Sequence, residues 1–346
     1  MKAVYIEERG GPEALIYGDA PDPEMRGDDS VLIRIRAASV NRFDLNARAG
    51  ENGVMVGLPR ILGLDLAGEV LDAGAAALEA GILPGARVVA DPRMPCQTCS
   101  SCRSGRDEDC GNRFDLGSRL DGTYAEMIAV PARSVHAIPD TLSFEDAAAM
   151  PIVFKTAWRM LTTKARAQPG ETVLVHAIGS GVGTAALQIA KLLGCRVIAT
   201  AGADWKLDRA LEMGADETVN YADPETWPEI VLALTEGEGV DVIIDSVGAP
   251  LWDGSFRVLG RQGRFVTCGV TAGHRVSLHL GQTFLRGLEI MGIGGFRTSD
   301  FETVMRLTRQ GMLRGTVGRV FPLSEAAEAH RLMESRDFFG KIVLTT

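Results

Sequence analysis

The feature that most constrains the fold is an alternation of strand-like and helix-like segments between residues 172 and 291. Short apolar segments recur there with helical stretches between them, which predicts a parallel sheet covered by helices on both faces. The expected strands are Thr172–His176, Arg196–Thr200, Glu217–Val219, Val240–Asp245, Arg264–Thr267 and Leu288–Met291. Six such strands indicate a dinucleotide-binding fold.

A glycine-rich turn follows the first of these strands. Its sequence, Gly179-Ser180-Gly181-Val182-Gly183, opens a helix that is expected to run to about Leu193. Glycines let the backbone approach a pyrophosphate, and N–H groups at the start of a helix hold its charge. The alternating glycines depart from the G-x-G-x-x-G pattern, so the prediction depends on the strand before the turn and the helix after it. A plain tight turn is the alternative.

The end of the next strand indicates which dinucleotide binds. NAD enzymes usually carry an acidic residue about twenty residues after the glycines. Thr200-Ala201-Gly202-Ala203 contains none, Lys206 and Arg209 follow, and Tyr221 is expected on the adenine side. We therefore expect NADPH, with NADH as the alternative, although Asp204 lies close to the expected phosphate. The other interpretation is that the two cations only solvate a helix.

The chain before about Thr141 consists of short β-like segments punctuated by Gly, Pro and Asp, which predicts a partly closed β-barrel. Within it, Cys96, Cys99, Cys102 and Cys110 are spaced x2, x2 and x7. Four thiolates from one loop fill the tetrahedral shell of Zn²⁺ and leave no position for substrate, so we expect a structural zinc. Two disulfides are the alternative, which is disfavoured because nothing else indicates an oxidising compartment.

Charge and composition argue against nucleic acid and membranes as partners. The net charge of −9 disfavours binding to nucleic acid or to an anionic membrane. The N-terminus carries an acidic cluster where a signal peptide needs an apolar core, and no apolar run of about 18 residues follows. We therefore expect a cytoplasmic, globular protein of two domains.

Taken together, these motifs resemble those of the medium-chain dehydrogenase/reductase superfamily, which includes zinc alcohol dehydrogenases and quinone oxidoreductases. The resemblance covers the whole chain. It rests on the cysteine lobe, Gly63-Leu-Asp-Leu-Ala-Gly68, Gly122-Thr-Tyr-Ala-Glu126, Thr156-Ala157, the glycine turn and Phe339-Gly340-Lys341. It implies an α/β protein with a GroES-like β-barrel catalytic domain and a Rossmann domain with a doubly wound parallel sheet. The barrel domain is expected at residues 1–150 and 297–346, with the zinc lobe at about 92–113, and the Rossmann domain at 151–296.

The resemblance also implies the residues that bind the cofactor. Arg42 is expected at the pyrophosphate, with a solvated surface charge as the alternative. The remaining expected contacts are Thr156, Gly179, Ser180, Gly181, Val182, Gly183, Ala201, Lys206, Tyr221, Gly269 and Lys341.

The same resemblance points to a missing metal site. The catalytic zinc of alcohol dehydrogenases is held at positions that match Asn41, Leu64 and Ile152 here. Two of these are hydrocarbons and a neutral amide is a poor zinc ligand, so we expect one structural zinc and no catalytic zinc. Phe43 stands where those enzymes place the Ser or Thr of their proton relay.

Without a metal to ionise a hydroxyl, reduction of an activated acceptor is favoured over oxidation of an alcohol. The pattern Asn41-x-x-Asp44 resembles the quinone oxidoreductase branch, which implies hydride transfer from NADPH to a hydrophobic quinone or α,β-unsaturated carbonyl. Asn41 is the expected donor to the substrate oxygen and Tyr124 a second donor. The alternatives are a loop residue that satisfies backbone groups and a packed aromatic ring, and Asp44 is expected to be structural.

Two other functions stay open. One is an alcohol dehydrogenase that acts on alcohols or aldehydes, and the other is a non-catalytic NADPH-binding redox sensor whose zinc thiolates become oxidised. A homodimer or homotetramer is expected because Leu288–Gly292 forms a sheet edge, and such edges commonly pair across a two-fold axis.

Overall fold

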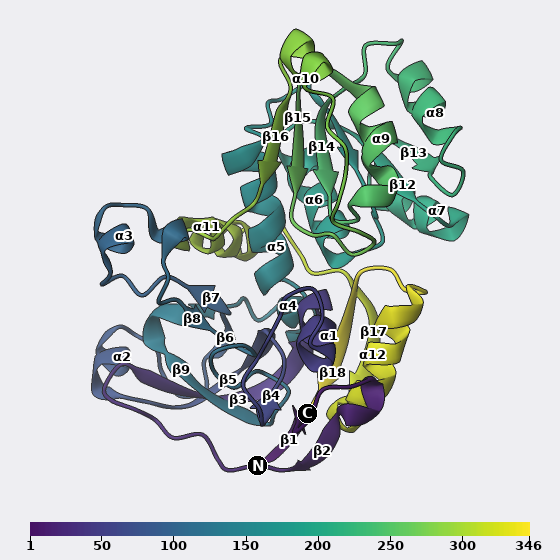
Figure 1. Ribbon diagram of the computed structural model, residues 1–346. Helices are drawn as coiled ribbons and strands as arrows, with labels where there is room; N and C mark the ends of the chain where they lie inside the picture. The colour runs from purple at the N-terminus through teal and green to yellow at the C-terminus, as the bar shows by residue number, and fades with distance from the viewer. The chain divides into compact units, whose positions relative to one another are not determined.

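The computed structural model describes all 346 residues, which form two compact units (Figure 1). Unit 1 comprises Met1–Ile152 and Gly295–Thr346, and unit 2 comprises Val153–Gly294. The sequence prediction places these boundaries at residues 150 and 297. The chain therefore leaves the first unit, builds the second, and returns to complete the first.

The main sheet of unit 1 is centred on β3 (Ser30–Ser39). This strand pairs with β5 (Asp65–Ala73), β9 (Met127–Pro131) and β18 (Lys341–Thr345), all antiparallel. Val31, Ile33 and Ile35 are fully buried whereas Arg34 is exposed, the period of two that a half-buried strand requires. The remaining strands of this sheet are β6 (Arg87–Ala90), β10 (Val135–Ala137) and β17 (Val317–Pro322).

Smaller elements close unit 1 around this sheet. Its core contains side chains of both chain segments, including Ile342 and Leu344 of β18 together with Ala329 and Met333 of the helix α12. Full burial of a side chain as large as Ile, Leu or Met stabilises a fold by roughly 1.5–3 kcal/mol. The other elements are β1 (Lys2–Ile6), β2 (Ile16–Asp19), β4 (Arg60–Ile61), β7 (Arg93–Met94), β8 (Phe114–Asp115), α1 (Arg42–Ala49), α2 (Ala75–Glu79), α3 (Ser100–Arg103), α4 (Phe144–Ala148), α11 (Thr298–Arg309) and α12 (Ala326–Ser335).

Unit 2 contains one parallel sheet of six strands in the order β13-β12-β11-β14-β15-β16. Its strands are β11 (Thr172–Val175), β12 (Arg196–Ala201), β13 (Glu217–Asn220), β14 (Val240–Asp245), β15 (Leu259–Thr267) and β16 (Glu289–Gly292). This confirms the predicted fold class, a GroES-like barrel combined with a Rossmann-type doubly wound sheet. The strand β15 starts earlier than expected because Leu259 pairs with Val240 across an irregularity.

The helices of unit 2 connect parallel strands. Right-handed connections place α6 (Gly181–Leu192) and α7 (Asp204–Glu212) on one face, and α8 (Trp227–Leu234) and α9 (Ala249–Val258) on the other, because the strand order reverses after β13. On the second face, Trp227 and Trp252 pack with Leu174 and Ile243. The unit also contains a π-helical segment, Arg159–Lys164, after α5 (Pro151–Trp158).

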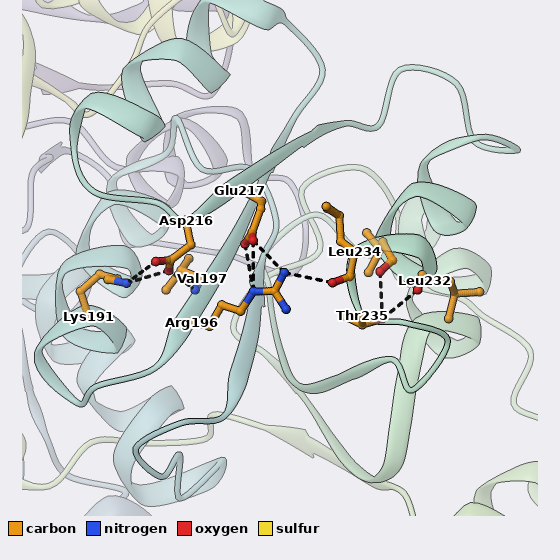
Figure 2. A network of polar contacts seen from close by, with 9 residues as sticks. Lys191, Arg196, Val197, Asp216, Glu217, Leu232, Leu234 and Thr235 are labelled. Atoms are coloured by element: carbon orange, nitrogen blue, oxygen red, sulfur yellow. Dashed lines mark hydrogen bonds and ion pairs between the residues drawn. The ribbon is translucent and has the colours of Figure 1, made fainter.

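A polar network fixes the amino-terminal ends of two neighbouring strands of this sheet (Figure 2). Arg196 of β12 donates to Glu217 of β13 (2.7 Å) and to the carbonyl oxygen of Leu234 (3.0 Å). Lys191 pairs with Asp216 (2.7 Å) beside them. This network lies at the amino edge of the sheet, so the carboxyl edge, where the glycine turn begins, is left for ligand.

The helix α10 (Leu280–Arg286) and the strand β17 are among the elements that were not predicted. Their side chains are largely exposed, so their sequences lack a regular alternation of apolar and polar residues. No helix of the chain combines the length and the apolar character needed to cross a membrane.

Candidate functional site

The four predicted zinc ligands converge on one point in unit 1. They lie on a loop between β7 and β8, and all four sulfur atoms are within 4.8 Å of one another. The Sγ atoms of Cys99 and Cys102 are 3.4 Å apart, and those of Cys99 and Cys110 are 3.8 Å apart. A tetrahedral zinc with Zn–S bonds of about 2.3 Å places its sulfurs about 3.8 Å apart, so the four cysteines fit Zn²⁺.

Hydrogen bonds to the sulfur atoms also suit a metal site. The backbone N–H of Cys99 donates to Sγ of Cys96 (3.3 Å), and the N–H of Cys96 donates to Sγ of Cys110 (3.2 Å). The hydroxyl and backbone N–H of Thr98, together with the N–H of Cys99, lower the pKa of Cys96 to about 5, whereas burial raises the pKa of Cys102 to about 12. Metal ligation needs thiolates, so Cys96 is the ligand whose surroundings most favour the form that binds zinc.

The lobe is joined to the second segment of unit 1. Glu108, beside the ligand Cys110, accepts from the guanidinium of Arg297 (2.7 Å). Asp107 accepts from the backbone N–H of Thr298 (3.1 Å), the first residue of α11. The zinc lobe therefore helps to hold the returning chain.

In unit 2, the glycine turn leads directly into α6. Ser180 caps this helix because its hydroxyl accepts from the N–H of Gly183 (3.0 Å). The N–H groups of Gly181 and Val182 have no acceptor within the chain and lie at the positive end of a twelve-residue helix. A side chain at Gly183 would meet the carbonyl oxygen of Ala177 at 2.5 Å, so only glycine permits this close turn. The site has the geometry that a pyrophosphate needs.

The predicted adenine-side residues meet at the end of β12. Ala201 ends the strand, and Gly202 follows with the ring of Tyr221 3.2 Å from where its Cβ would be. Lys206 lies in the first turn of α7, with its ammonium 5.3 Å from the ring centroid of Trp205. Asp204 accepts from the amide of Asn220 (2.6 Å). The carboxylate that opposes a 2′-phosphate is therefore engaged by a neutral partner.

The last two predicted cofactor contacts of unit 2 are Gly269, which comes after the end of β15, and Thr156 on α5. Gly269 follows β15, where its carbonyl oxygen accepts from the hydroxyl of Thr267 (3.0 Å). Nearby, burial raises the pKa of Asp245 at the end of β14 to about 6. Thr156 is a buried residue of α5. Ala201 is the last residue of its strand, and the glycine turn and Gly269 follow theirs, so all three lie at the carboxyl edge of the sheet.

In unit 1, a buried polar cluster forms around Asp65, the first residue of β5. We call Ser39, Asn41, Asp65 and Lys341 the Asp65 cluster. Oδ2 of Asp65 accepts from Ser39 Oγ (3.0 Å), Asn41 Nδ2 (2.9 Å) and Lys341 Nζ (3.2 Å). Oδ1 accepts from the backbone N–H of Ile152 (2.9 Å). Each oxygen of this fully buried carboxylate therefore has donors, and one of them is a cation.

Asn41 is fixed within this cluster. Its Oδ1 accepts from the ammonium of Lys341 (2.5 Å), and its Nδ2 donates to Asp65 and to the carbonyl oxygen of Ser39 (3.2 Å). An ammonium only donates and a carboxylate only accepts, so the amide has a single consistent orientation. The cluster brings Asn41 and Lys341 together, although the sequence assigned them to substrate and cofactor respectively. Both roles stay predictions.

Tyr124 lies in a second buried chain of hydrogen bonds, which we call the Asp44 chain. Its hydroxyl donates to Oδ2 of Asp44 (3.2 Å) and contacts Nε2 of His330 (3.2 Å). Arg48 lies 3.1 Å from the other ring nitrogen of His330 and 2.5 Å from Glu334. Tyr124 is fully buried and its hydroxyl is engaged by these partners. Its role as a substrate donor stays a prediction.

Burial shifts the pKa values along the Asp44 chain. Burial raises the pKa of Asp44 to about 7, against the opposing effect of the N–H that Asn41 donates to it (2.8 Å). Oδ1 of Asp44 has no hydrogen-bond partner. Burial lowers the pKa of His330 to about 3 and raises that of Tyr124. Asp44 caps α1 through the N–H of Asn41, which agrees with the structural role expected for it.

Arg42, at the start of α1, lies close to α12. Its guanidinium donates to the carbonyl oxygen of Met333 (3.5 Å), and burial together with the charge of Arg336 lowers its pKa. The expected contact with a pyrophosphate is untested and stays a prediction.

Comparison with known proteins gives the family. Residues 27–140 match the model of the alcohol dehydrogenase GroES-like domain, and residues 181–310 match the zinc-binding dehydrogenase model. The chain is 32% identical to acryloyl-coenzyme A reductase of Metallosphaera sedula over 347 residues, which cover 100% of both chains. The chain belongs to the medium-chain dehydrogenase/reductase superfamily.

Other members of the superfamily carry different names. The chain is 30% identical to quinone oxidoreductase of Sus scrofa, with 99% of this chain and 97% of that one covered. A solved structure of an NAD-dependent alcohol dehydrogenase is 42% identical, covers 100% of both chains and superposes with a TM-score of 0.94. The protein is thus an oxidoreductase of this superfamily with a nicotinamide cofactor and a zinc-binding cysteine cluster.

Among superfamily positions, the sequence analysis missed Asp65 as the centre of a cluster. The signal was present, because Asp65 interrupts the apolar stretch Leu64-Asp-Leu-Ala, and a charge within a buried strand needs a partner. That partner is Lys341, which lies 276 residues away in the sequence. No pattern near Asp65 indicates which residue it pairs with.

Proposed function

We propose that the protein reduces a quinone or an α,β-unsaturated carbonyl with NADPH, without a catalytic metal. The observation that carries this proposal is the Asp65 cluster. In alcohol dehydrogenases, the catalytic zinc is held at positions that correspond to Asn41, Leu64 and Ile152. In this chain, those three segments meet at Asp65, whose carboxylate already has an internal cation in Lys341.

The donor set at these positions argues against a second metal. Leu64 and Ile152 offer only hydrocarbon side chains, and both polar ends of the Asn41 amide are hydrogen bonded. Elsewhere in the chain, the single group of three or more His, Cys, Asp or Glu side chains with metal-binding geometry is the cysteine lobe. Its four thiolates would complete the zinc shell and leave no open position.

An acceptor that is already polarised suits such a site. When bound, a reduced nicotinamide would supply the hydride. The chain's own residues then need to bind the acceptor, exclude water and stabilise the negative charge that develops on its oxygen. The names of two relatives, acryloyl-coenzyme A reductase and quinone oxidoreductase, describe acceptors of this kind and support the proposal.

The preference for NADPH rests on the end of β12. The strand end Thr200-Ala201-Gly202-Ala203 carries no carboxylate, and the next residue, Asp204, is hydrogen bonded to Asn220. Lys206 in the first turn of α7 supplies a positive charge close to this strand end. A 2′-phosphate is favoured by these features, whereas an NAD enzyme usually offers an acidic residue.

The test is a substrate panel with both reduced cofactors. We expect NADPH oxidation with quinones and enones and little NADP⁺ reduction with primary or secondary alcohols at alkaline pH. Efficient alcohol oxidation without quinone or enone reduction would contradict the proposal. Alcohol dehydrogenase is the second candidate function, because the solved structure of that name shares 42% of its residues with this chain.

We also propose that two copies of the chain associate through the edge of unit 2. The strand β16 ends the sheet and has no neighbour on its outer side. Beside it, Leu280, Phe284 and Leu285 of α10 are 72%, 81% and 63% exposed, which is unusual for large apolar side chains of a monomer. Pairing of two such edges would bury both the backbone groups and the apolar patch.

Light scattering tests this proposal about the assembly. Wild-type protein should have the mass of a dimer or tetramer, and Phe284→Glu should lower it. Leu83→Glu, at an exposed apolar residue of unit 1, is the matched control and should leave the mass unchanged. A wild-type monomer would contradict the proposal.

A further inference from the structure

Lys341 is a buried cation with incomplete hydrogen bonding. It is 3% exposed and starts β18, which places it beside β3 in the interior of unit 1. Its ammonium carries three N–H groups. Two of them have acceptors, Oδ1 of Asn41 (2.5 Å) and Oδ2 of Asp65 (3.2 Å). The third has no acceptor within the chain.

Asn41 has no donor to spare. The two N–H groups of its amide point to Asp65 (2.9 Å) and to the carbonyl oxygen of Ser39 (3.2 Å). To donate to a substrate, the amide would have to abandon a buried carboxylate or rotate its oxygen away from Lys341. Either change leaves a buried polar group without its partner, which is costly. The amide is thus suited to holding Lys341 and poorly suited to donating outwards.

We propose that Lys341 is the donor to the carbonyl oxygen of the substrate, with Asn41 and Asp65 as positioning residues. The proposal rests on the proposed function, the reduction of an enone or quinone. It names a proton donor for the reaction, which the sequence analysis did not identify. It also assigns a chemical reason to the cluster, which places an ammonium against Asn41, a residue at a position that matches a zinc ligand of the alcohol dehydrogenases.

The step balances as follows for an enone. The β-carbon of the substrate accepts a hydride from the reduced nicotinamide, and the electron pair of the C=C bond moves so that negative charge develops on the carbonyl oxygen. The third N–H of Lys341 donates to that oxygen and transfers its proton, which leaves an enol and a neutral amine. The enol tautomerises to the saturated carbonyl, and the amine regains a proton from water. One hydride and one proton are consumed overall.

The surroundings of Lys341 suit this proton transfer. Burial lowers its pKa, and the negative charges of Asp65 on β5 and Asp44 on α1 act in the opposite direction. Ser39 on β3 and the N–H of Ile152 share the Asp65 carboxylate, but neither carries charge. A lysine with a lowered pKa releases a proton more readily than an exposed one. The reaction should therefore slow as the pH rises through the pKa of Lys341.

A pair of variants separates Lys341 from Asn41. Lys341→Met should reduce kcat for an enone by about 100-fold or more, whereas Asn41→Ala should reduce it by about 10-fold or less. The opposite ranking would overturn the proposal. Because Lys341→Met leaves Asp65 buried without its cation, the double variant Lys341→Met/Asp65→Asn is measured beside it. The double variant should fold and stay as slow as the single variant, and recovery of activity would also overturn the proposal.

Binding of NADPH distinguishes the proposed role from a cofactor contact. Fluorescence titration should give Lys341→Met a Kd for NADPH within about twofold of wild type, with the loss confined to kcat. A weakened Kd with unchanged kcat would place Lys341 at the cofactor and overturn the proposal. The kcat profile of wild type should fall at high pH, and Asp44→Asn should keep this fall. Lys2→Met, at a half-buried lysine of β1 that pairs with Asp19, is the control.

A spectroscopic probe tests the contact without turnover. The enal 4-(dimethylamino)cinnamaldehyde absorbs at longer wavelength when its carbonyl oxygen is polarised. With oxidised cofactor present, wild-type protein should shift its absorption to the red, Asn41→Ala should keep most of the shift, and Lys341→Met should abolish it. No shift in wild type at saturating probe, or an equal shift in Lys341→Met, would overturn the proposal. Failure of the proposed function appears separately, as a red shift in wild type without turnover of any enone or quinone.

Discussion

Unit 1 contains two clusters in which negative charge is brought together, and the two clusters obtain the compensating positive charge from different sources. The zinc lobe brings together four sulfur ligands and no internal cation, so an external metal is needed to neutralise them. The Asp65 cluster contains a carboxylate and its own ammonium, with the remaining lone pairs filled by Ser39, Asn41 and Ile152. The difference indicates that the metal content of each site follows from whether the chain supplies the positive charge itself.

The zinc lobe should be the more sensitive of the two clusters. Cys110→Ser removes a buried ligand, and since the binding free energy of a structural zinc is folding free energy, we expect a loss of about 5 kcal/mol or more in the stability of unit 1. Chemical denaturation and zinc release measure this. Cys195→Ser, at a buried cysteine of unit 2, should retain the metal and most of the stability. If the two variants lost the same amount of zinc and stability, the cysteine lobe would not be the zinc site that stabilises unit 1.

The Asp65 cluster should respond to loss of its internal cation. Lys341→Met leaves a buried carboxylate unpaired, and we expect a cost of about 3–5 kcal/mol in the free energy of unfolding. The double variant with Asp65→Asn should recover most of that loss. If the changes in unfolding free energy of Lys341→Met and Asp65→Asn added up to that of the double variant, Lys341 and Asp65 would not act as a pair.

Asp44 should give the stability of unit 1 a distinctive pH dependence. Its pKa is about 7 in the folded protein and near the ordinary value of 3.8 when unfolded, so the folded state binds more protons between these values. The Asp44 contribution to stability therefore falls as the pH rises from about 4 to 7, by on the order of 4 kcal/mol at most. His330, with its pKa lowered to about 3, contributes the opposite slope between about 3 and 6.5.

Asp44→Asn isolates this contribution. The stability of the variant relative to wild type should increase steadily between about pH 4 and 7, measured by urea denaturation at several pH values. Asp253→Asn, at an exposed carboxyl of unit 2, is the control and should show a constant difference. A constant difference for Asp44→Asn as well would mean that Asp44 is already ionised throughout this range.

The smallest expected effect lies in unit 2. Lys206→Glu should raise the KM for NADPH relative to that for NADH by about 10-fold, since it replaces a cation near the expected 2′-phosphate with an anion. Lys164→Glu, on the π-helical segment of the same unit, should leave the ratio unchanged. An unchanged ratio for both variants would remove Lys206 from the phosphate site and would leave the choice of cofactor to other residues.

The sequence predicts most of the fold because the fold has local signals. Alternating strands and helices, the glycine turn before α6 and the cysteine spacing all depend on residues that are close in the chain. The structure confirms the strand Val240–Asp245 to the residue. The zinc ligands were predictable for the same reason, since all four lie within one loop.

The interior of the barrel could not be predicted in the same way. Asn41, Asp65 and Lys341 come from α1's cap, β5 and β18, and only the pairing of these strands with β3 brings them together. The sequence assigned Asn41 and Lys341 separate roles because neither residue shows its partner. The same holds for Tyr124, whose hydroxyl bonds to His330 across 206 residues. Residues whose function depends on such long-range pairs need the structure.

The most direct test of the central claim is the zinc content of extensively dialysed protein, measured together with enone reduction. The account predicts one zinc per chain, lost in Cys110→Ser and retained in Lys341→Met, with NADPH-dependent turnover in the wild type. Two zinc ions per chain, with the second lost when Asp65 is replaced, would contradict it. That result would mean that Asp65 serves a metal and that Lys341 is not the cation of this site.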